Sequence, residues 1–311
     1  MKIAIIDLGT NTFNLLVVGW DNHVVKKIHS SKISVRLGDG GFAEKRIHEA
    51  AFNRGLLAFS QQIQEAQQLG VEKVYAFATS AVRGASNGKD FVKAIYNQHR
   101  IKVDVISGDR EAELIYKGVQ LSGVLSETPM LIMDIGGGST EFVIANNEQI
   151  FWKQSFPLGV ARILDMYKPS DPITDVEVAI IENFLHTAVE NVFSAIQAYP
   201  IDTLVGSSGT FDSLVDMIQV AHGHQATSEL KRFSEIPVRE YYRIYAKLLK
   251  STLAERQQMP GLISLRVDFI VMALIFINLI IKEANIVKVW QSGYSLKEGV
   301  LSELKPRVLH G

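Results

Sequence analysis

One short pattern occurs twice in this chain of 311 residues, about one domain length apart. The first copy is "AIIDLGTNTFNLLVV" at residues 4–18, and the second is "LIMDIGGGSTEFVIA" at residues 131–145. In each copy an apolar run ends in aspartate, a turn with glycine and small hydroxyl residues follows, and a second apolar run begins. Two apolar runs joined by such a turn predict a β-hairpin. Its recurrence predicts a fold that is built twice.

The segments after the first hairpin alternate between two kinds of pattern. β-branched residues continue to about residue 35, and apolar residues then recur at helical spacing between residues 48 and 69. The next expected elements are strands at 73–79 and 102–107 and helices at 89–99 and 109–121. Such alternation predicts an α/β layer architecture.

The segments after the second hairpin restart the same plan. The expected elements are a strand at 149–156, helices at 159–166 and 174–199, a strand at 202–207, a helix from Gly209 and a polar loop at 221–235. Because a single domain of this length is uncommon, two domains are expected. We predict domains at 1–123 and 124–294, an inter-domain cleft, and a final helix at about 295–311 that packs back on the first domain.

Composition narrows the class of protein. Residues 1–123 carry 16 Lys and Arg against 12 Asp and Glu, and the remainder carries 16 against 21, so the first half is better suited to an anionic ligand. The chain has no cysteine, which excludes disulfides and thiolate chemistry and matches a reducing compartment. Asp7 interrupts the first apolar run, which argues against a secretory signal. The apolar segment at 269–281 is shorter than the roughly 20 residues of a membrane crossing and predicts a buried core helix. A cytoplasmic protein without membrane contact is expected.

The two turns carry residues that suit a phosphate ligand. Glycine leaves backbone N–H groups unshielded, and Ser, Thr and Asn add donors. Phosphate binding is therefore predicted for Gly9, Thr10, Asn11 and Thr12 in the first turn and for Gly136, Gly137, Gly138 and Ser139 in the second. Either turn alone is more typical of an ordinary hairpin, but two copies at matching positions favour a clamp for phosphate and metal with one turn from each domain.

An aspartate ends the strand before each turn, at Asp7 and Asp134. A carboxylate about 4 Å from a phosphate charge would be repelled by roughly 4 kcal/mol at an effective dielectric constant of about 20. A divalent cation between the two groups removes this repulsion, and Mg²⁺ commonly bridges carboxylates and substrate phosphates. We therefore expect Mg²⁺ beside Asp7 and Asp134.

Six motifs, "DLGTNTFNLLV", "ATSAVRGASNGKDFV", "ISGDREAELIYKGV", "DIGGGSTEF", "GSSGTF" and "SLKEGVL", follow one another between residues 5 and 301. In this order they resemble the exopolyphosphatase and guanosine pentaphosphate phosphohydrolase family of the actin, sugar kinase and heat-shock chaperone superfamily. The resemblance implies two actin-like, ribonuclease H-like domains. It also implies Mg²⁺-assisted removal of the terminal phosphate from inorganic polyphosphate or guanosine pentaphosphate.

The resemblance further implies roles for single residues. It matches the catalytic glutamate to Glu111, which would orient and deprotonate the attacking water, although an acid in a first helical turn is also favoured by the helix dipole. Glu113 lies about 200° further round that helix and is expected to face elsewhere. Glu141 is matched to metal or water placement, and Arg83 to a phosphoryl oxygen.

A third small-residue turn, "GSSGTF", separates a predicted strand from a predicted helix. Gly206, Ser208 and Gly209 are expected to offer amides to distal phosphates or to a nucleotide. Arg266 and Asp268 precede the apolar segment, where an internal ion pair and a substrate contact are equally consistent with the sequence.

Some positions depart from the pattern of the resembling family. Asn14 stands where many members have a basic residue, and Lys297 stands where arginine is usual. The chain ends soon after "LKEGVL", without the helical extension of longer members, which argues against processive handling of long chains. Two alternatives remain open: an ATP-dependent kinase of the same superfamily, and a non-catalytic sensor of polyphosphate or an alarmone. No nucleic acid polymer is expected as a partner, and a homodimer is left open.

Overall fold

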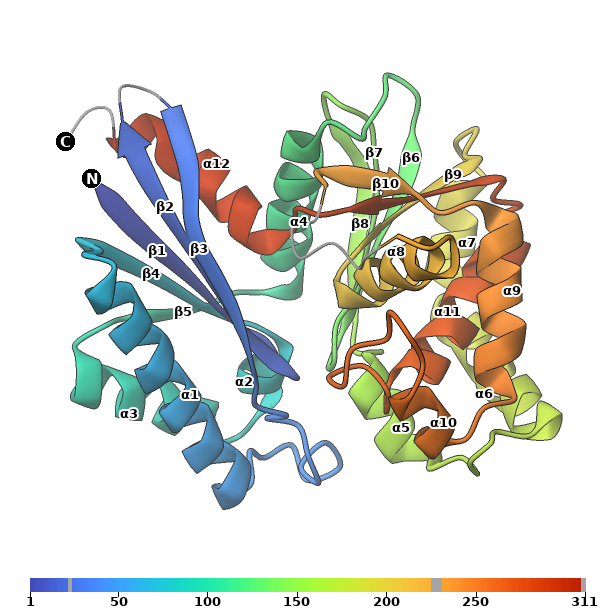
Figure 1. Cartoon of the computed structure of the whole chain (residues 1–311), viewed down its shortest axis with the longest axis horizontal. Helices are drawn as coiled ribbons and strands as arrows, with labels where there is room; N and C mark the ends of the chain where they lie inside the picture. Colours follow the sequence, from blue (N-terminus) through green and yellow to red (C-terminus); the bar gives the residue numbers. More distant parts are fainter. Residues whose placement is uncertain (22–23, 225–230, 309–311) are drawn as a thin grey trace.

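The computed structural model describes residues 1–21, 24–224 and 231–308 (Figure 1). Two β-sheets form the centres of two domains. The first sheet has the order β3-β2-β1-β4-β5. Its strands are β1 (Lys2–Leu8), β2 (Thr12–Asp21), β3 (Val24–Ser34), β4 (Lys73–Ala78) and β5 (Val103–Val105).

The second sheet has the order β10-β11-β9-β6-β7-β8. Its strands are β6 (Met130–Ile135), β7 (Thr140–Ala145), β8 (Ile150–Phe156), β9 (Thr203–Ser207), β10 (Phe233–Glu235) and β11 (Lys288–Ser292). Read from β8 to β11, it repeats the order of the first sheet, with an antiparallel hairpin beside parallel strands. The predicted α/β fold with two repeated halves is confirmed.

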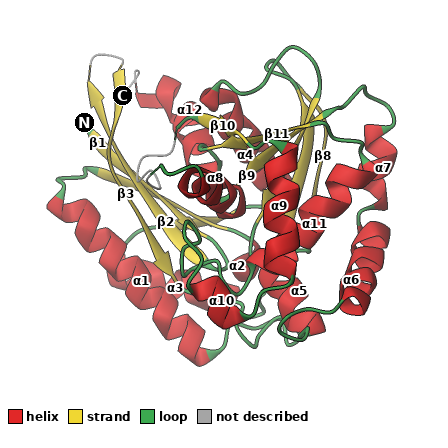
Figure 2. Ribbon diagram, turned by 45° about the vertical axis from the view of Figure 1, so that its right-hand side comes forward, coloured by secondary structure: helices red, strands yellow, loops and turns green. Residues whose placement is uncertain are grey.

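Helices cover the sheets and connect them. The first half contains α1 (Glu49–Gln68), α2 (Ser80–Gly84), α3 (Gly88–His99) and α4 (Gly108–Ser122). The second half contains α5 (Val160–Tyr167), α6 (Asp175–Ala188), α7 (Glu190–Ile196), α8 (Gly209–Ala221), α9 (Val238–Leu249), α10 (Leu253–Gln257) and α11 (Ile270–Glu283), and α12 (Leu296–Val308) follows. In Figure 2, α1 and α3 lie on the outer side of the first sheet, and α6, α7 and α9 lie on the far side of the second.

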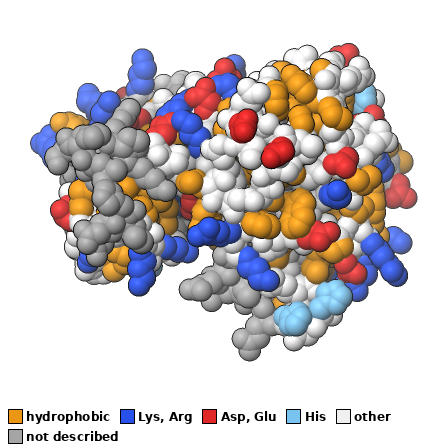
Figure 3. Space-filling model, turned by 90° about the horizontal axis from the view of Figure 1, so that it is seen from above, with side chains coloured by type: hydrophobic (Ala, Val, Ile, Leu, Met, Phe, Trp, Pro, Cys, Tyr) orange, Lys and Arg blue, Asp and Glu red, His pale blue; other side chains and the backbone are white. Residues whose placement is uncertain are grey.

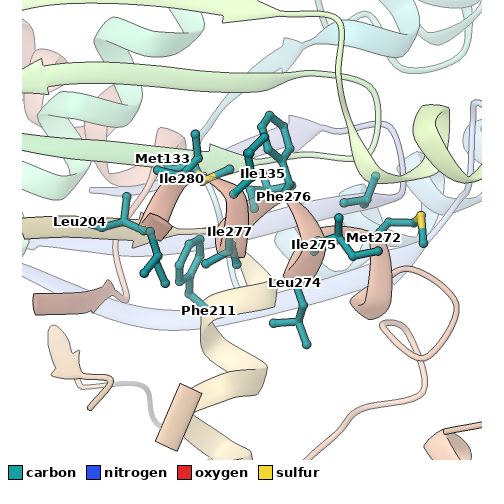
Figure 4. Packing of buried hydrophobic residues seen from close by; sticks show 14 of the residues in the cluster. Met133, Ile135, Leu204, Phe211, Met272, Leu274, Ile275, Phe276, Ile277 and Ile280 are labelled. Carbon is teal, nitrogen blue, oxygen red and sulfur yellow. The ribbon is translucent and has the colours of Figure 1, made fainter. Parts of the chain in front are cut away.

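Helix α11 forms the centre of the second domain. Every residue from Ile270 to Ile281 is buried, and the exception to their apolar character is Asn278, whose side chain donates to Glu182 and Tyr245. Among the described residues, no helix is long and apolar enough to cross a membrane. The prediction of a buried core helix is confirmed. Side chains that pack around α11 come from β6, β9 and α8 and are seen in Figure 4: Met133, Ile135, Leu204 and Phe211.

A separate hydrophobic cluster lies between the two sheets. Helices α4 and α12 pack against each other there, and Figure 1 shows both between the sheets. The cluster joins Ile3 and Ile5 of β1 to Met130 and Ile132 of β6. Helix α12 also contacts β1 of the first sheet. One apolar layer therefore holds both domains.

Two predicted elements differ from the structure. The helix expected at 174–199 is interrupted at Val189, whose ψ of 23° ends α6 before α7 begins. The loop expected at 221–235 contains the short strand β10, because Phe233 packs its ring against Trp290 of β11 with centroids 5.8 Å apart. The remainder of that expectation falls partly on residues 225–230, which lie outside the described residues.

Candidate functional site

The two hairpin turns meet between the domains. A Cβ atom added to Gly138 would lie 2.7 Å from Thr10 Oγ1, and one added to Gly137 would lie 2.5 Å from the Asn11 side chain. Only glycine allows this approach of one turn to the other. Both turns line one cavity of about 200 Å³. The two turns, one from each domain, therefore lie side by side at this cavity.

The register of the hairpins places each aspartate opposite a polar residue. In the strand register, Asp7 of β1 lies opposite Asn14 of β2, and Asp134 of β6 lies opposite Glu141 of β7. Asn14 Nδ2 donates to Asp7 Oδ2 at 3.0 Å. Asp134 Oδ2 accepts from Ser295 Oγ, just before α12, at 2.9 Å. Both carboxylates thus reach the cavity with one oxygen held in place.

Glu111 enters the cavity from the first turn of α4. Ser107 caps this helix, because its side chain accepts from the Arg110 amide at 3.2 Å. Glu111 is 7% exposed, and Arg83 Nη1 donates to its Oε2 at 2.9 Å while also donating to the Ile106 carbonyl. The carboxylate is therefore oriented by a cation behind it. Glu113 pairs with Arg110 and Lys153 outside the cavity, as predicted.

The buried carboxylates all bind protons more readily than free ones. Burial raises the pKa of Asp7 to about 6, with further contributions from Asp134 and Glu298 against the opposing charge of Lys297. Burial likewise raises the pKa of Glu111 to about 7, more than the Arg83 ion pair lowers it. The pKa values of Asp134 and Glu141 are also raised, chiefly by burial. Such clustered acids favour a proton or a cation beside them.

Several buried donors on the cavity wall have no partner. Asn11 Nδ2, Ser208 Oγ and Arg266 Nε make no hydrogen bond within the described part of the chain. Ser208 holds a φ of 103°, which is strained for a residue with a side chain and is typical of functional sites. A Cβ on Gly209 would lie 1.7 Å from Arg266 Nη2, so glycine is required where this guanidinium passes. The wall thus carries buried donors that the described side chains leave unpaired.

The structure brings most predicted residues to this cavity and leaves three outside its wall. Arg83 acts through Glu111, and Glu141 accepts from Ser155 Oγ at 2.7 Å. Gly206 lies within β9, where a Cβ would lie 2.0 Å from the Phe211 ring, so its smallness serves packing. The cavity wall includes Asp7, Gly9, Thr10, Asn11, Thr12, Glu111, Asp134, Gly136, Gly137, Gly138, Ser139, Ser208 and Gly209.

For Arg266 and Asp268 the sequence left open an internal ion pair or a substrate contact, and the structure gives the two residues different surroundings. Asp268 accepts from Arg36 of the first domain, whereas Arg266 lines the cavity. Sequence reasoning missed Lys32 and Asp212, which also line the cavity. A signal for Lys32 exists in the register, because β3 places it opposite Asn14. Nothing in the local sequence indicates that Asp212 faces it.

The acidic side chains at the cavity fit a divalent cation that is held by two carboxylates. Across residues 1–21, 24–224 and 231–308, no three His, Cys, Asp or Glu side chains converge as a metal cluster, and Glu141 lies outside the cavity wall. Asp7 and Asp134 do line one cavity, with raised pKa values that a cation would relieve. Two carboxylates with substrate oxygens and water suit Mg²⁺.

The fold and site define a two-domain α/β protein with a cavity between its domains that is lined by buried acids and unpaired donors. A family model agrees with this description. The Ppx/GppA phosphatase family matches residues 16–308, and the chain belongs to this family.

Solved structures and curated relatives extend the match. An exopolyphosphatase from Cytophaga hutchinsonii is 35% identical with a TM-score of 0.95, covering 99% of this chain and 98% of that one. A Ppx/GppA family member from Aquifex aeolicus shares the fold, with a TM-score of 0.82, 22% identity and coverage of 100% and 99%. A guanosine-5'-triphosphate,3'-diphosphate pyrophosphatase from Aeromonas salmonicida is 27% identical over 96% of this chain and 58% of its own length. The chain thus spans less than two thirds of this curated relative.

Proposed function

We propose that this protein is a phosphohydrolase that removes the terminal phosphate from inorganic polyphosphate or guanosine pentaphosphate. The observation that carries the proposal is the joint lining of one cavity by buried acids and unpaired buried donors. A cavity that only bound an anion would gain from donors such as Asn11 and Ser208. It would lose from burying Asp7, Glu111 and Asp134 beside that anion.

In the proposed mechanism, Glu111 takes the proton of the attacking water. Its raised pKa of about 7 suits a general base near neutral pH. Arg83 keeps the acceptor oxygen oriented, since its guanidinium contacts Glu111 Oε2. The turn amides and the unpaired donors hold the terminal phosphoryl group, whose charge spreads over its outer oxygens in the transition state.

Asp7 and Asp134 would hold Mg²⁺, which supplies neutralisation of phosphate charge when bound. Asp7 Oδ2 accepts from Asn14 and Asp134 Oδ2 accepts from Ser295, and these hydrogen bonds orient both carboxylates in the cavity. Glu141 lies close enough to Glu111 and Asp134 to interact with both electrostatically. We propose that its role is to adjust the pKa values of these two acids from outside the cavity wall.

The substrate remains a choice between two phosphoanhydrides. The name of the Cytophaga hutchinsonii relative favours inorganic polyphosphate, and that of the Aeromonas salmonicida relative favours a guanosine nucleotide. On the face in Figure 3, basic and acidic side chains are interspersed and do not gather into one basic track. We therefore propose distributive action with a preference for short substrates.

Orthophosphate release from polyphosphate and from guanosine pentaphosphate, with Mg²⁺ and with chelator, tests the proposal. We expect Mg²⁺-dependent release from at least one substrate. Partial digestion of a long polyphosphate should shift the whole length distribution gradually, and intact chains beside fully degraded product would contradict distributive action. Binding of either substrate without any release would favour a sensor instead.

A further inference from the structure

The cavity carries opposite charge at its two ends. Asp134 raises the pKa of Asp7, and both aspartates raise the pKa of Glu111, so these three acids form the acidic end. Lys297 acts electrostatically on both Asp7 and Lys32, so it lies between the acidic end and a second group of charges. We call this second group the basic end and define it by Lys32, Lys297, Arg266 and the carboxylate of Asp212, all of which line the cavity.

The four side chains of the basic end come from four separate parts of the chain: β3, α8, the segment before α11, and α12. Burial lowers the pKa of Lys32, and the charges of Lys297 and Arg266 lower it further while Asp212 opposes them. Lys32 therefore lies within electrostatic range of two further cations and one carboxylate. Because the acidic end holds the proposed base Glu111, the part of the substrate beyond the scissile bond would lie at the basic end.

Asp212 is fixed on one side and faces the cleft on the other. Gln291 Nε2, from β11 of the same domain, donates to Asp212 Oδ1 at 2.9 Å. Lys32 Nζ, from β3 of the other domain, lies 3.5 Å from Asp212 Oδ2. The Asp212 side chain is 17% exposed against 41% for Lys32, so the carboxylate is the better held of the two.

The basic end also has unused capacity for anionic oxygens. Arg266 Nε and Ser208 Oγ are buried on its wall and make no hydrogen bond among the described residues. A phosphate oxygen can accept hydrogen bonds from these two donors. A further phosphate that reached Lys32 would meet the Asp212 carboxylate, which already engages this cation and repels a second anion.

We propose that Asp212 limits the negative charge that the basic end accepts, and thereby selects short phosphate chains over long ones. By engaging Lys32 across the cleft, it withdraws one cation from the binding of additional phosphates. The inference rests on the proposed function, since it concerns the substrate of the same cavity.

The test is Asp212→Asn, with Asp216→Asn as the matched control. Asparagine keeps the shape of the side chain and an acceptor for Gln291, but it releases Lys32. Asp216 lies one turn later on α8 and feels the charge of Lys32, yet it does not line the cavity. Both substitutions remove one negative charge from the same helix, so they separate a cavity effect from an overall charge effect.

The measurement is kcat/KM for orthophosphate release from tripolyphosphate and from long-chain polyphosphate at several salt concentrations. For Asp212→Asn, the long-chain to tripolyphosphate ratio should rise on the order of tenfold at low salt and fall back as salt screens the freed cation. For Asp216→Asn, the ratio should stay unchanged. Equal changes for both substrates, or the same change in both variants, would overturn the inference.

Equilibrium binding separates this inference from the proposed function. If the unsubstituted protein releases no orthophosphate from either polyphosphate, the hydrolase proposal fails. Binding of the two polyphosphates, measured with Glu111→Gln and with Glu111→Gln/Asp212→Asn, still decides the role of Asp212. The second variant should bind the long chain more tightly by a larger factor than it binds tripolyphosphate, and equal factors would refute charge selection.

Discussion

The two halves of the molecule share one plan and differ at two positions that matter for chemistry. In each hairpin, a glycine follows the aspartate by two residues, at Gly9 and Gly136. A Cβ on either would press on a carbonyl three residues further on, at 2.8 and 3.0 Å respectively. The turns are therefore the same device built twice. The residue opposite the aspartate is different, because the first half has Asn14 and the second has Glu141.

The second difference lies on the two helices between the sheets. Glu111 N donates to the carbonyl of Ser107, and Gly299 N donates to that of Ser295, so the two residues occupy equivalent helical positions. A Cβ on Gly299 would lie 1.8 Å from the Leu114 carbonyl oxygen, which leaves room only for glycine. At this helical position the first half has the carboxylate of Glu111, whereas the second half has Gly299, where α12 crosses α4. Repetition of the fold gives two similar turns. The differences between Asn14 and Glu141 and between Glu111 and Gly299 make the two sides of the cavity chemically unequal.

The largest expected effect comes from removing the carboxylate of Glu111, which has no counterpart at the equivalent position of α12. Glu111→Gln keeps shape but cannot take a proton, so kcat should fall about 10²- to 10⁴-fold with substrate binding retained. Glu113→Gln, on the same helix but outside the cavity, should stay within about threefold of the unsubstituted enzyme. Steady-state kinetics on the purified variants check this. Near-normal turnover of Glu111→Gln would remove it from the mechanism.

The two symmetric aspartates should behave alike. Asp7→Ala and Asp134→Ala should each raise the Mg²⁺ concentration for half-maximal activity by at least about tenfold, because both would hold one ion. The double variant should cost less than the product of the single effects, as for groups with a shared partner. Mg²⁺ titrations of activity measure both effects. An unchanged Mg²⁺ requirement in either single variant would exclude that aspartate from the cation site.

The helix crossing should be sensitive to one methyl group. Gly299→Ala should reduce the free energy of unfolding by about 1–3 kcal/mol, because α12 must move away from α4. Gly84→Ala is the matched control, since a Cβ there would meet no atom within 4 Å. Denaturant titration of both variants gives the comparison. Equal stability of the two would mean that the crossing is not tight.

The smallest expected effect concerns the difference between Asn14 and Glu141. Glu111 must be charged to act as a base, so its raised pKa of about 7 predicts that kcat/KM falls as pH drops through about 7. The charge of Glu111 raises the pKa of Glu141, and such repulsion between two carboxyl groups is reciprocal, so Glu141→Gln should move the acid limb to lower pH. A pH-rate profile at saturating Mg²⁺ measures the shift. Movement to higher pH would contradict the proposed coupling.

Much of the fold could be predicted because its signals are local. Apolar runs, helical spacing and turn residues each act over a few positions, and they correctly indicated both hairpins and the core helix α11. Val189 interrupts a helical pattern without proline or glycine, so no local signal marks that break. Strand β10 depends on Trp290, which lies more than fifty residues away in the chain.

The sequence by itself determined the repeated turns, their aspartates and the acid at Glu111, because chemistry and spacing are written in consecutive residues. Only the tertiary structure decided which groups face one another. Lys32 and Asp212 are 180 residues apart, and Asp134 and Ser295 are 161 apart. Such pairs depend on how two sheets pack around α4 and α12, and packing is a property of the whole chain. For the same reason Gly206, which resembles a ligand contact in its motif, became a packing residue beneath Phe211.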